Sequence, residues 1–114
     1  MFRLLTLILL VCTFSGFSQV QLASKQVLLD NQQVEVVRAV YPVGTESGMH
    51  THHFANRVVY FVQGGQLELI SADATQKPTI LIAEKGKTLF LPATTHNVKN
   101  IGHTQVIIVE TEIK

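Results

Sequence analysis

The sequence predicts an all-β fold that follows a short N-terminal leader. Segments rich in β-branched and alternating apolar residues recur along the chain, and turns containing glycine or proline separate them. No segment after the leader shows sustained helical periodicity. Many short strands joined by regular turns are typical of a β-sandwich or a β-barrel. One domain is expected, because the 114 residues contain no internal repeat and no low-complexity tract.

The leader has the organisation of a secretory signal peptide. Arg3 supplies a positive charge, residues 4–11 are almost all apolar, and small and polar residues follow. The apolar run is too short to span a bilayer. We therefore expect a signal peptide at residues 1–18, with cleavage near Ser18. The mature protein would then be periplasmic or secreted, with no membrane association.

Two other interpretations of the leader stay open. Cys12 could be the acylated residue of a lipoprotein, although Val11 is bulkier than the small residue expected before such a cysteine. The leader could also remain in place as an uncleaved membrane anchor.

The expected mature chain has no net charge and no cysteine. Loss of Arg3 leaves eight basic and eight acidic residues, so there is no positive excess to bind a nucleic acid. Cys12 is the only cysteine, so a disulfide cannot stabilise the exported domain. A domain this small buries a limited fraction of its surface. We therefore expect a homodimer, in which sheet edges are covered.

Apolar alternation and turn residues place the strands. Pro42 ends the first strand, and Gly64 with Gly65 is a hairpin signal between two later strands. Polar turns are expected at residues 73–78 and 85–87. The expected strands span residues 34–41, 58–62, 66–70, 79–83, 88–91, 97–99 and 105–113.

Three histidines are candidate metal ligands. His50 and His52 lie one residue apart just before the strand at 58–62, and extended backbone would turn both side chains to the same face. His96 follows Pro92 much later in the chain. Three imidazoles on one face can hold a divalent metal, whereas the alternative is a solvated histidine loop.

The residues around the first two histidines follow a regular spacing. Gly44 is followed by five residues and then by His50 and His52. Four residues separate His52 from Arg57, and six more lead to Gly64. Around the third histidine, Gly86 is followed by five residues, Pro92, three residues, His96, three residues and Asn100.

These two spacings resemble the two motifs of the cupin superfamily, in the order in which that family has them. The chain departs from the family at Thr94, where the second motif has a glycine, and at Arg57, where the first has a glutamate. The resemblance covers residues 30–112 and implies a double-stranded β-helix, or jelly-roll, barrel. It also implies a metal inside the barrel held by His50, His52 and His96, with zinc, iron, manganese, nickel or copper as candidates, and a small-molecule ligand.

The missing glutamate changes what the site can do. Its position falls on Arg57, or on Asn56 if the shorter spacing applies. A guanidinium cannot ligate a metal and would repel one. Arg57 therefore points elsewhere, or the site binds metal weakly, or it holds something other than a metal. In the pocket, Arg57 could bind a carboxylate or phosphate of a small ligand, and Asn56 is the second candidate contact.

Other polar residues have simpler interpretations. Alternation places His53 on the opposite face from His52, and His103 follows Gly102 in a turn, so we expect both to be exposed. Asn100 is expected to cap a turn.

The chain looks most similar to small exported bacterial single-domain cupins of the type-2 kind, and two function classes follow. The first is a protein that binds a divalent metal and a small ligand without an assignable reaction. The second is a metal-dependent oxygenase or isomerase acting on a small organic molecule. The second class needs an acid or base beside the metal, so the orientation of Glu68 and Glu110 distinguishes the two.

Overall fold

The computed structural model describes residues 11–12 and 19–114. Nearly all of the predicted signal peptide, residues 1–18, lies outside the described residues. The two described residues of that segment, Val11 and Cys12, are exposed, and Cys12 is a free thiol. In the described part of the chain, no helix has the length and apolar character needed to cross a bilayer.

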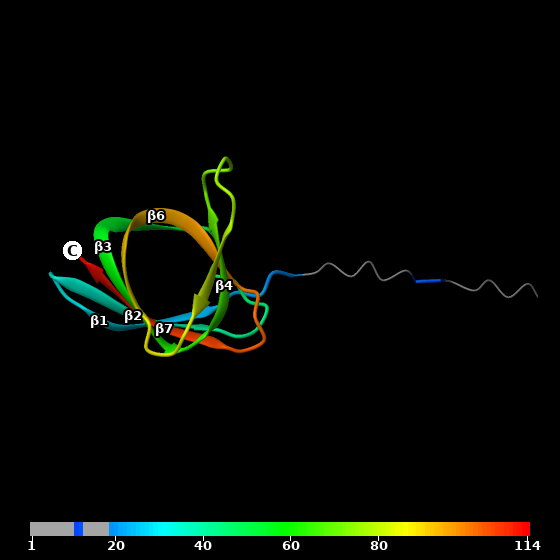
Figure 1. Cartoon of the computed structure of the whole chain (residues 1–114), viewed down its shortest axis with the longest axis horizontal. Helices are drawn as coiled ribbons and strands as arrows, with labels where there is room; N and C mark the ends of the chain where they lie inside the picture. The colour runs from blue at the N-terminus through cyan, green and yellow to red at the C-terminus, as the bar shows by residue number, and fades with distance from the viewer. Residues whose placement is uncertain (1–10, 13–18) are drawn as a thin grey trace, which may run out of the picture.

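Residues 19–114 form an antiparallel β-barrel without helices. Its strands curve around a common interior (Figure 1). The order across the sheet is β1-β2-β7-β3-β6-β4-β5. The strands are β1 Ser24–Asp30, β2 Val34–Tyr41, β3 His50–Gln63, β4 Gly65–Ser71, β5 Thr79–Ala83, β6 Thr88–Asn100 and β7 Val106–Ile113. The all-β prediction is confirmed.

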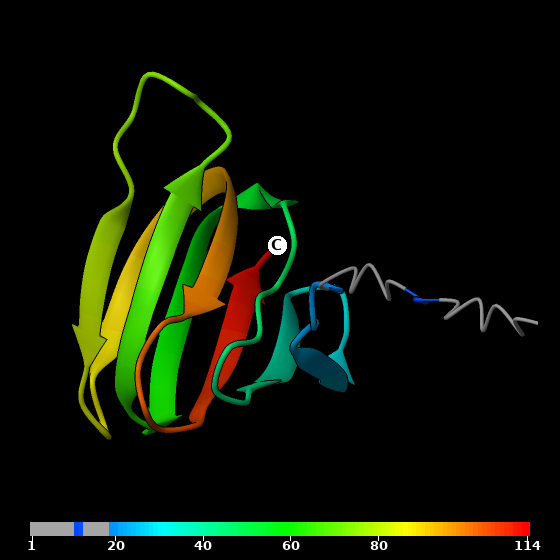
Figure 2. The same ribbon diagram turned by 90° about the vertical axis from the view of Figure 1, so that its right-hand side faces the viewer.

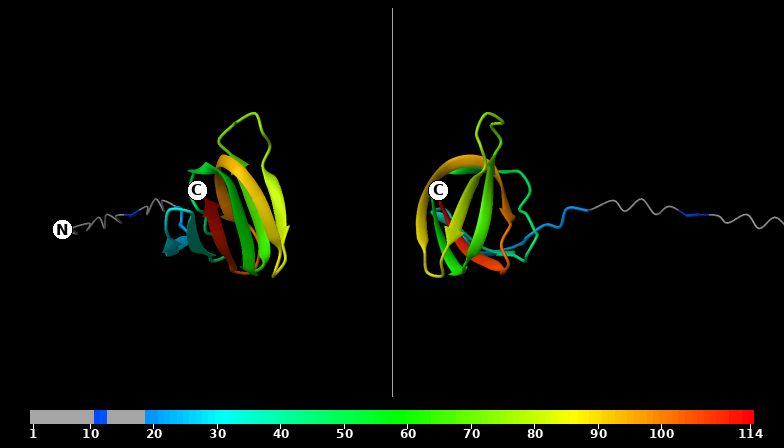
Figure 3. Two further views of the ribbon diagram at one scale, coloured as in Figure 1. Left: turned by 90° about the vertical axis from the view of Figure 1, so that its left-hand side faces the viewer. Right: turned by 45° about the vertical axis from the view of Figure 1, so that its right-hand side comes forward.

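Two views show the shape of the barrel. The segment between β4 and β5, yellow-green in the picture, stands out beyond the body of the barrel (Figure 2). β1 and β5 lie at the two edges of the sheet (Figure 3).

Inward-facing side chains from several strands form the core, because alternate residues of each strand turn to the interior. The buried apolar core consists of Ala39, Tyr41, Val59, Phe61, Leu67, Ala83, Val98, Val106 and Ile108.

The predicted hairpin at Gly64 and Gly65 was wrong. β3 pairs with β6 and β7, and β4 pairs with β5 and β6, so the two strands that flank these glycines do not pair with each other. Neither glycine has a positive φ, which a type I′ hairpin turn requires. The glycines permit close packing instead: a Cβ on Gly64 would lie 2.4 Å from the carbonyl oxygen of Ala83.

Other strand bounds differ from the predicted ones in ways that matter for the site. β3 begins at His50, so the two motif histidines lie in the strand itself. β6 is one continuous strand where two short ones were expected. β1 was not predicted at all, and it extends the sheet upstream of residue 30.

A bulge in β3 decides which of its residues face inward. His52 is opposite Thr94 and Asn56 is opposite Pro92, so β3 has two more residues than β6 over this stretch. Arg57 comes five positions after His52, and an odd interval would place the two side chains on opposite faces of a regular strand. At this irregularity the alternation is interrupted, because residues 53–56 are all exposed, and both His52 and Arg57 are buried.

Candidate metal centre

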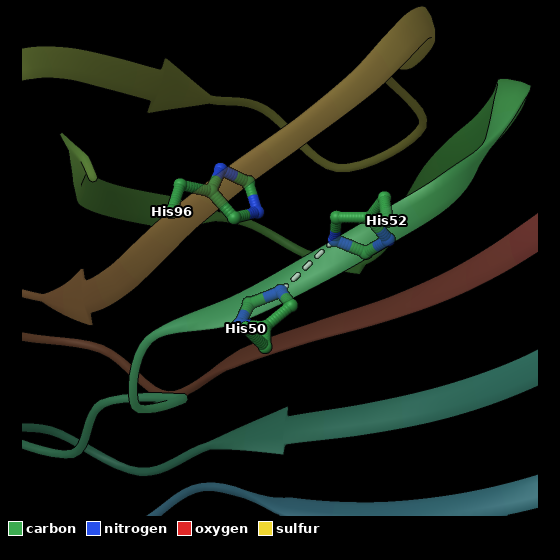
Figure 4. A group of neighbouring side chains, drawn as sticks. All are labelled: His50, His52 and His96. Atoms are coloured by element: carbon green, nitrogen blue, oxygen red, sulfur yellow. Dashed lines mark hydrogen bonds between the residues drawn. The ribbon is translucent and has the colours of Figure 1, made fainter. Parts of the chain in front are cut away.

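The three predicted histidines converge inside the barrel. His50 and His52 extend from β3 and His96 from β6, where His96 is directly opposite His50 in the register (Figure 4). The ring centroids of each pair are 4.7 to 5.1 Å apart. One potential ligand atom from each ring lies within 4.8 Å of the other two. Residues far apart in sequence are therefore close enough to share one ion.

Hydrogen bonds fix the tautomers of His50 and His52. His50 Nδ1 lies 2.9 Å from the carbonyl oxygen of Gly48, which can only accept, so Nδ1 carries the proton. His52 Nδ1 donates to a carboxylate oxygen of Glu112. A neutral imidazole carries one N–H, so Nε2 of each ring is left with a lone pair. In metal-binding histidines, the ring nitrogen that does not bind the metal usually donates its N–H to an acceptor of this kind.

The rings are held in the neutral state that metal binding requires. Burial lowers the pKa of His50 below its usual value. Burial, with the nearby charge of Arg57, lowers the pKa of His52 to about 3. Burial, with the neighbouring His50 and His52, lowers the pKa of His96 to about 3 as well. All three rings are therefore neutral at neutral pH, with one N–H each.

The two bare nitrogens face each other. His50 Nε2 and His52 Nε2 are 2.9 Å apart, and with both protons on Nδ1 no hydrogen lies between them. Two lone pairs at this distance repel unless a cation lies beside both. Nitrogens that bind a zinc-sized ion at about 2.0–2.1 Å are roughly 3 Å apart on neighbouring positions. The donor set thus fits a divalent transition metal.

Arg57 lies inside the barrel, close to this group. It is 2% exposed, and its Nη1 donates to the carbonyl oxygen of Pro92. Its Nε lies 3.4 Å from a carboxylate oxygen of Glu110 on β7. The guanidinium charge therefore has a counter-ion, and the repulsion expected between Arg57 and a metal is reduced.

Two glutamates on β7 complete the charged part of the site. Glu112 is 8% exposed and accepts from His52, while Glu110 lies 3.6 Å from the same His52 nitrogen. Burial raises the pKa of both carboxyl groups, and the positive charge of Arg57 opposes the rise. Glu112 is not among the residues that the sequence predicts for the site, and the sequence alone does not determine the orientation of Glu110. Alternation from the buried Val106 and Ile108 places both glutamates inward, and this pattern could have identified them.

The structure places the remaining predicted residues outside the site. Asn56 is exposed and does not line the cavity, so it gives no support to a ligand-binding role. His53 and His103 are exposed, as expected. Asn100 holds a turn, accepting from the Gly102 N–H and donating to the Thr104 carbonyl oxygen. Glu68 is not among the cavity-lining residues.

The three histidines line part of a cavity of about 380 Å³ inside the barrel. Its wall is mostly aliphatic and aromatic, with Phe61, Leu81 and Leu91 among the lining residues. Small-molecule sites are usually concave and mostly apolar, with a few placed polar groups. The cavity has this character.

Comparison of the sequence with known proteins finds a distant relative. No family model matches the chain. An uncharacterized protein of Methanocaldococcus jannaschii is 26% identical over 74 residues. The match covers 64% of this chain and 54% of that protein, so the chain spans about half the length of this relative.

Solved structures match more of the chain. A cupin domain from Bordetella pertussis is 29% identical, with a TM-score of 0.77, over 86% of this chain and 99% of that one. A Klebsiella pneumoniae protein with a double-stranded β-helix domain is 19% identical, with a TM-score of 0.66, over 85% and 81%. A Schizosaccharomyces pombe cupin domain is 19% identical, with a TM-score of 0.62, over 88% and 69%.

The seven antiparallel strands of residues 19–114, together with the similar solved structures, define a double-stranded β-helix protein with a histidine cluster in its interior. The chain belongs to the cupin superfamily. The resemblance of its two motifs to those of that superfamily is confirmed.

Proposed function

We propose that this cupin binds a divalent transition metal through His50, His52 and His96, and a small molecule in the adjoining cavity. The observation that carries the proposal is the pair of unprotonated Nε2 atoms, 2.9 Å apart. Zinc, iron, manganese, nickel and copper all accept imidazole ligands, and the donor set does not choose among them. When bound, such an ion would act as a Lewis acid beside the cavity.

The test is metal analysis of the protein purified without a histidine tag, followed by calorimetric titration with Zn²⁺ and Co²⁺. The variant His96→Ala should bind roughly tenfold more weakly or worse, because even loss of a residue that only orients a ligand has about that effect. His103→Ala removes an exposed histidine outside the site and should bind like the parent. If the folded parent binds neither ion, the histidines are not a metal site.

A second candidate is a metal-dependent oxygenase or isomerase acting on a small organic molecule. The observation that favours it is Glu110, which lines the cavity and whose pKa is raised by burial. A carboxyl group with a raised pKa can serve as a general acid or base. Mass spectrometry of small organic acids incubated with the iron- or manganese-loaded protein would detect turnover. Glu110→Gln should then abolish turnover. If none of the candidate acids gives a product, the enzymatic function is contradicted and the binding function stands.

We also propose export by the signal peptide at residues 1–18, to the periplasm or outside the cell. The support is the charge, apolar run and small residues of the leader. N-terminal sequencing of protein from its native host should begin near residue 19. An intact Met1 would contradict cleavage, and an acylated Cys12 would establish the lipoprotein alternative.

A further inference from the structure

We infer that the cavity binds a small organic anion with an apolar body, whose charged group is held by Lys25, Arg57 and Lys77. This inference rests on the proposed function, because it assigns a ligand class to the same cavity. Three kinds of observation support it: the shape and lining of the cavity, the sign of its charge, and the unused donors of Arg57.

The size and lining of the cavity suit a molecule with an apolar body. Its volume of about 380 Å³ lies within the range of roughly 300–1,000 Å³ typical of small-molecule sites. Most of its wall is apolar. A small inorganic ion alone would leave this wall in contact with water, whereas a hydrocarbon or aromatic group would cover it.

The charge of the cavity is positive. Among the described residues, its charged lining consists of Lys25, Arg57 and Lys77 against one carboxylate, Glu110. The histidines add no charge, because burial keeps them neutral, and a bound metal would add more positive charge. Glu110 neutralises Arg57, so the two lysines set the net sign. An anion is therefore favoured over a neutral or cationic ligand.

The two lysines are placed to reach a ligand. Lys25 is on β1 and Lys77 is in the segment between β4 and β5, and both are exposed while lining the cavity. This combination puts them where the cavity meets solvent. Within residues 19–114 neither lysine forms an ion pair, so both ammonium groups are available.

Arg57 supplies the buried donors. Its guanidinium has five N–H groups, and in the part of the chain that the structure describes it forms one hydrogen bond, from Nη1 to the carbonyl oxygen of Pro92. Its Nε is buried 3.4 Å from the Glu110 carboxylate and, within residues 19–114, forms no hydrogen bond. Buried donors without partners destabilise a fold, and a ligand oxyanion would satisfy them. Arg57 thereby has a role that the missing motif glutamate could not fill.

The experiment compares acids with neutral molecules of the same shape. The protein is titrated by calorimetry with benzoate, phenylacetate and 3-phenylpropionate, with the three corresponding amides, and with phenyl phosphate. At least one anion should bind about tenfold more tightly than its matched amide. Preference for a carboxylate or for phenyl phosphate identifies which oxyanion the site takes, and either result supports the inference.

Lysine variants then test the residues. Lys25→Gln and Lys77→Gln should each weaken anion binding about three- to fivefold, as expected for partly exposed charges. Lys87→Gln, an exposed lysine outside the cavity, should have no effect. All three changes are at exposed positions, so the fold should be retained, and circular dichroism checks this.

The outcomes separate this inference from the proposed function. Amides that bind as tightly as acids, or lysine variants that bind the anion like the parent, would overturn the inference. Binding of Co²⁺ without binding of any anion would overturn it while the metal site stands. A folded protein that binds neither Co²⁺ nor any organic probe would contradict both.

Discussion

His52 is the residue through which the histidines and the glutamates are connected. Its Nε2 faces His50, and its Nδ1 donates to Glu112 on β7. In the cupin motif a glutamate would come from β3, but here Arg57 takes that position and the nearest carboxylates belong to a neighbouring strand. Glu112 contacts the nitrogen of His52 that does not face the other histidines. We therefore interpret Glu112 as a positioning residue and not as a metal ligand.

This interpretation predicts the effect of Glu112→Gln. A glutamine can still accept from His52 Nδ1, but without the negative charge that makes the imidazole a stronger ligand. Zinc affinity measured by competition titration should fall about tenfold to a hundredfold. Glu84→Gln, an exposed position in the turn after β5, serves as the control. Unchanged affinity in Glu112→Gln would show that the carboxylate does not act through His52.

Tyr41 gives a second prediction, on stability at high pH. Burial, with the negative charge of Glu110, raises the pKa of the Tyr41 phenol from 10.0 to about 12. The folded state therefore favours the neutral phenol, and its contribution is complete below pH 10.0 and lost as pH rises towards about 12. Two pKa units correspond to about 3 kcal/mol.

Urea unfolding between pH 9 and 12 measures this loss. Over this pH range the free energy of unfolding of Tyr41→Phe should fall by about 3 kcal/mol less than that of the parent, since no phenol remains to ionise. Tyr60→Phe, on the exposed outer face, should decline as the parent does. A parent and a Tyr41→Phe variant with the same pH slope would contradict the assignment.

At the scale of the elements, the sequence predicts a strand well where the residues of that strand alone are enough to define it. The bounds of β2 and β5 coincide with the predicted ranges 34–41 and 79–83. In β2, alternation and Pro42 define the strand without reference to any neighbour. β1 was missed because all its residues are exposed, so no inward alternation marks it.

The site was predictable in part, for the same reason. His50 and His52 share a face by local alternation, and the motif spacing associated them with His96. The inward position of Arg57 depends on the bulge in β3, which exists only in relation to β6. The Arg57–Glu110 pair likewise depends on the register between β3 and β7. Pairing between distant strands is not written in local patterns, so these contacts required the structure.

The wrong hairpin leads to a prediction about Gly64. In a type I′ turn asparagine is well tolerated, because the turn requires positive φ. At Gly64 the constraint is contact with the Ala83 carbonyl oxygen, so a larger side chain fits worse. Gly64→Ala should lower the free energy of unfolding by about 1–3 kcal/mol, and Gly64→Asn by at least as much.

Gly44 provides the opposite case within the same chain. Its φ is 81° and a Cβ there would meet open space. Gly44→Asn should therefore be more stable than Gly44→Ala, because asparagine tolerates the left-handed region. Urea denaturation of the four variants measures both orders. Gly64→Asn more stable than Gly64→Ala would restore the hairpin interpretation.

At the scale of the whole molecule, the two edges of the sheet remain unpaired within residues 19–114. β1, with seven residues against five in β5, is the longer edge, and its consecutive apolar residues Val27, Leu28 and Leu29 are 57%, 49% and 50% exposed. An exposed apolar edge strand is a template for pairing with another chain. The only charged side chains on β1 lie at its ends, Lys25 and Asp30, so its centre carries no charge that would prevent pairing.

We therefore predict a homodimer that pairs through β1. Light scattering at micromolar concentration should give twice the monomer mass, because a small barrel gains stability by covering this edge. Leu28→Lys places a charge at the centre of the edge and should shift the protein to monomer. Ile82→Lys makes the same change on the β5 edge and should leave the dimer intact. A parent of monomer mass would contradict the dimer, and dissociation by Ile82→Lys alone would move the interface to β5.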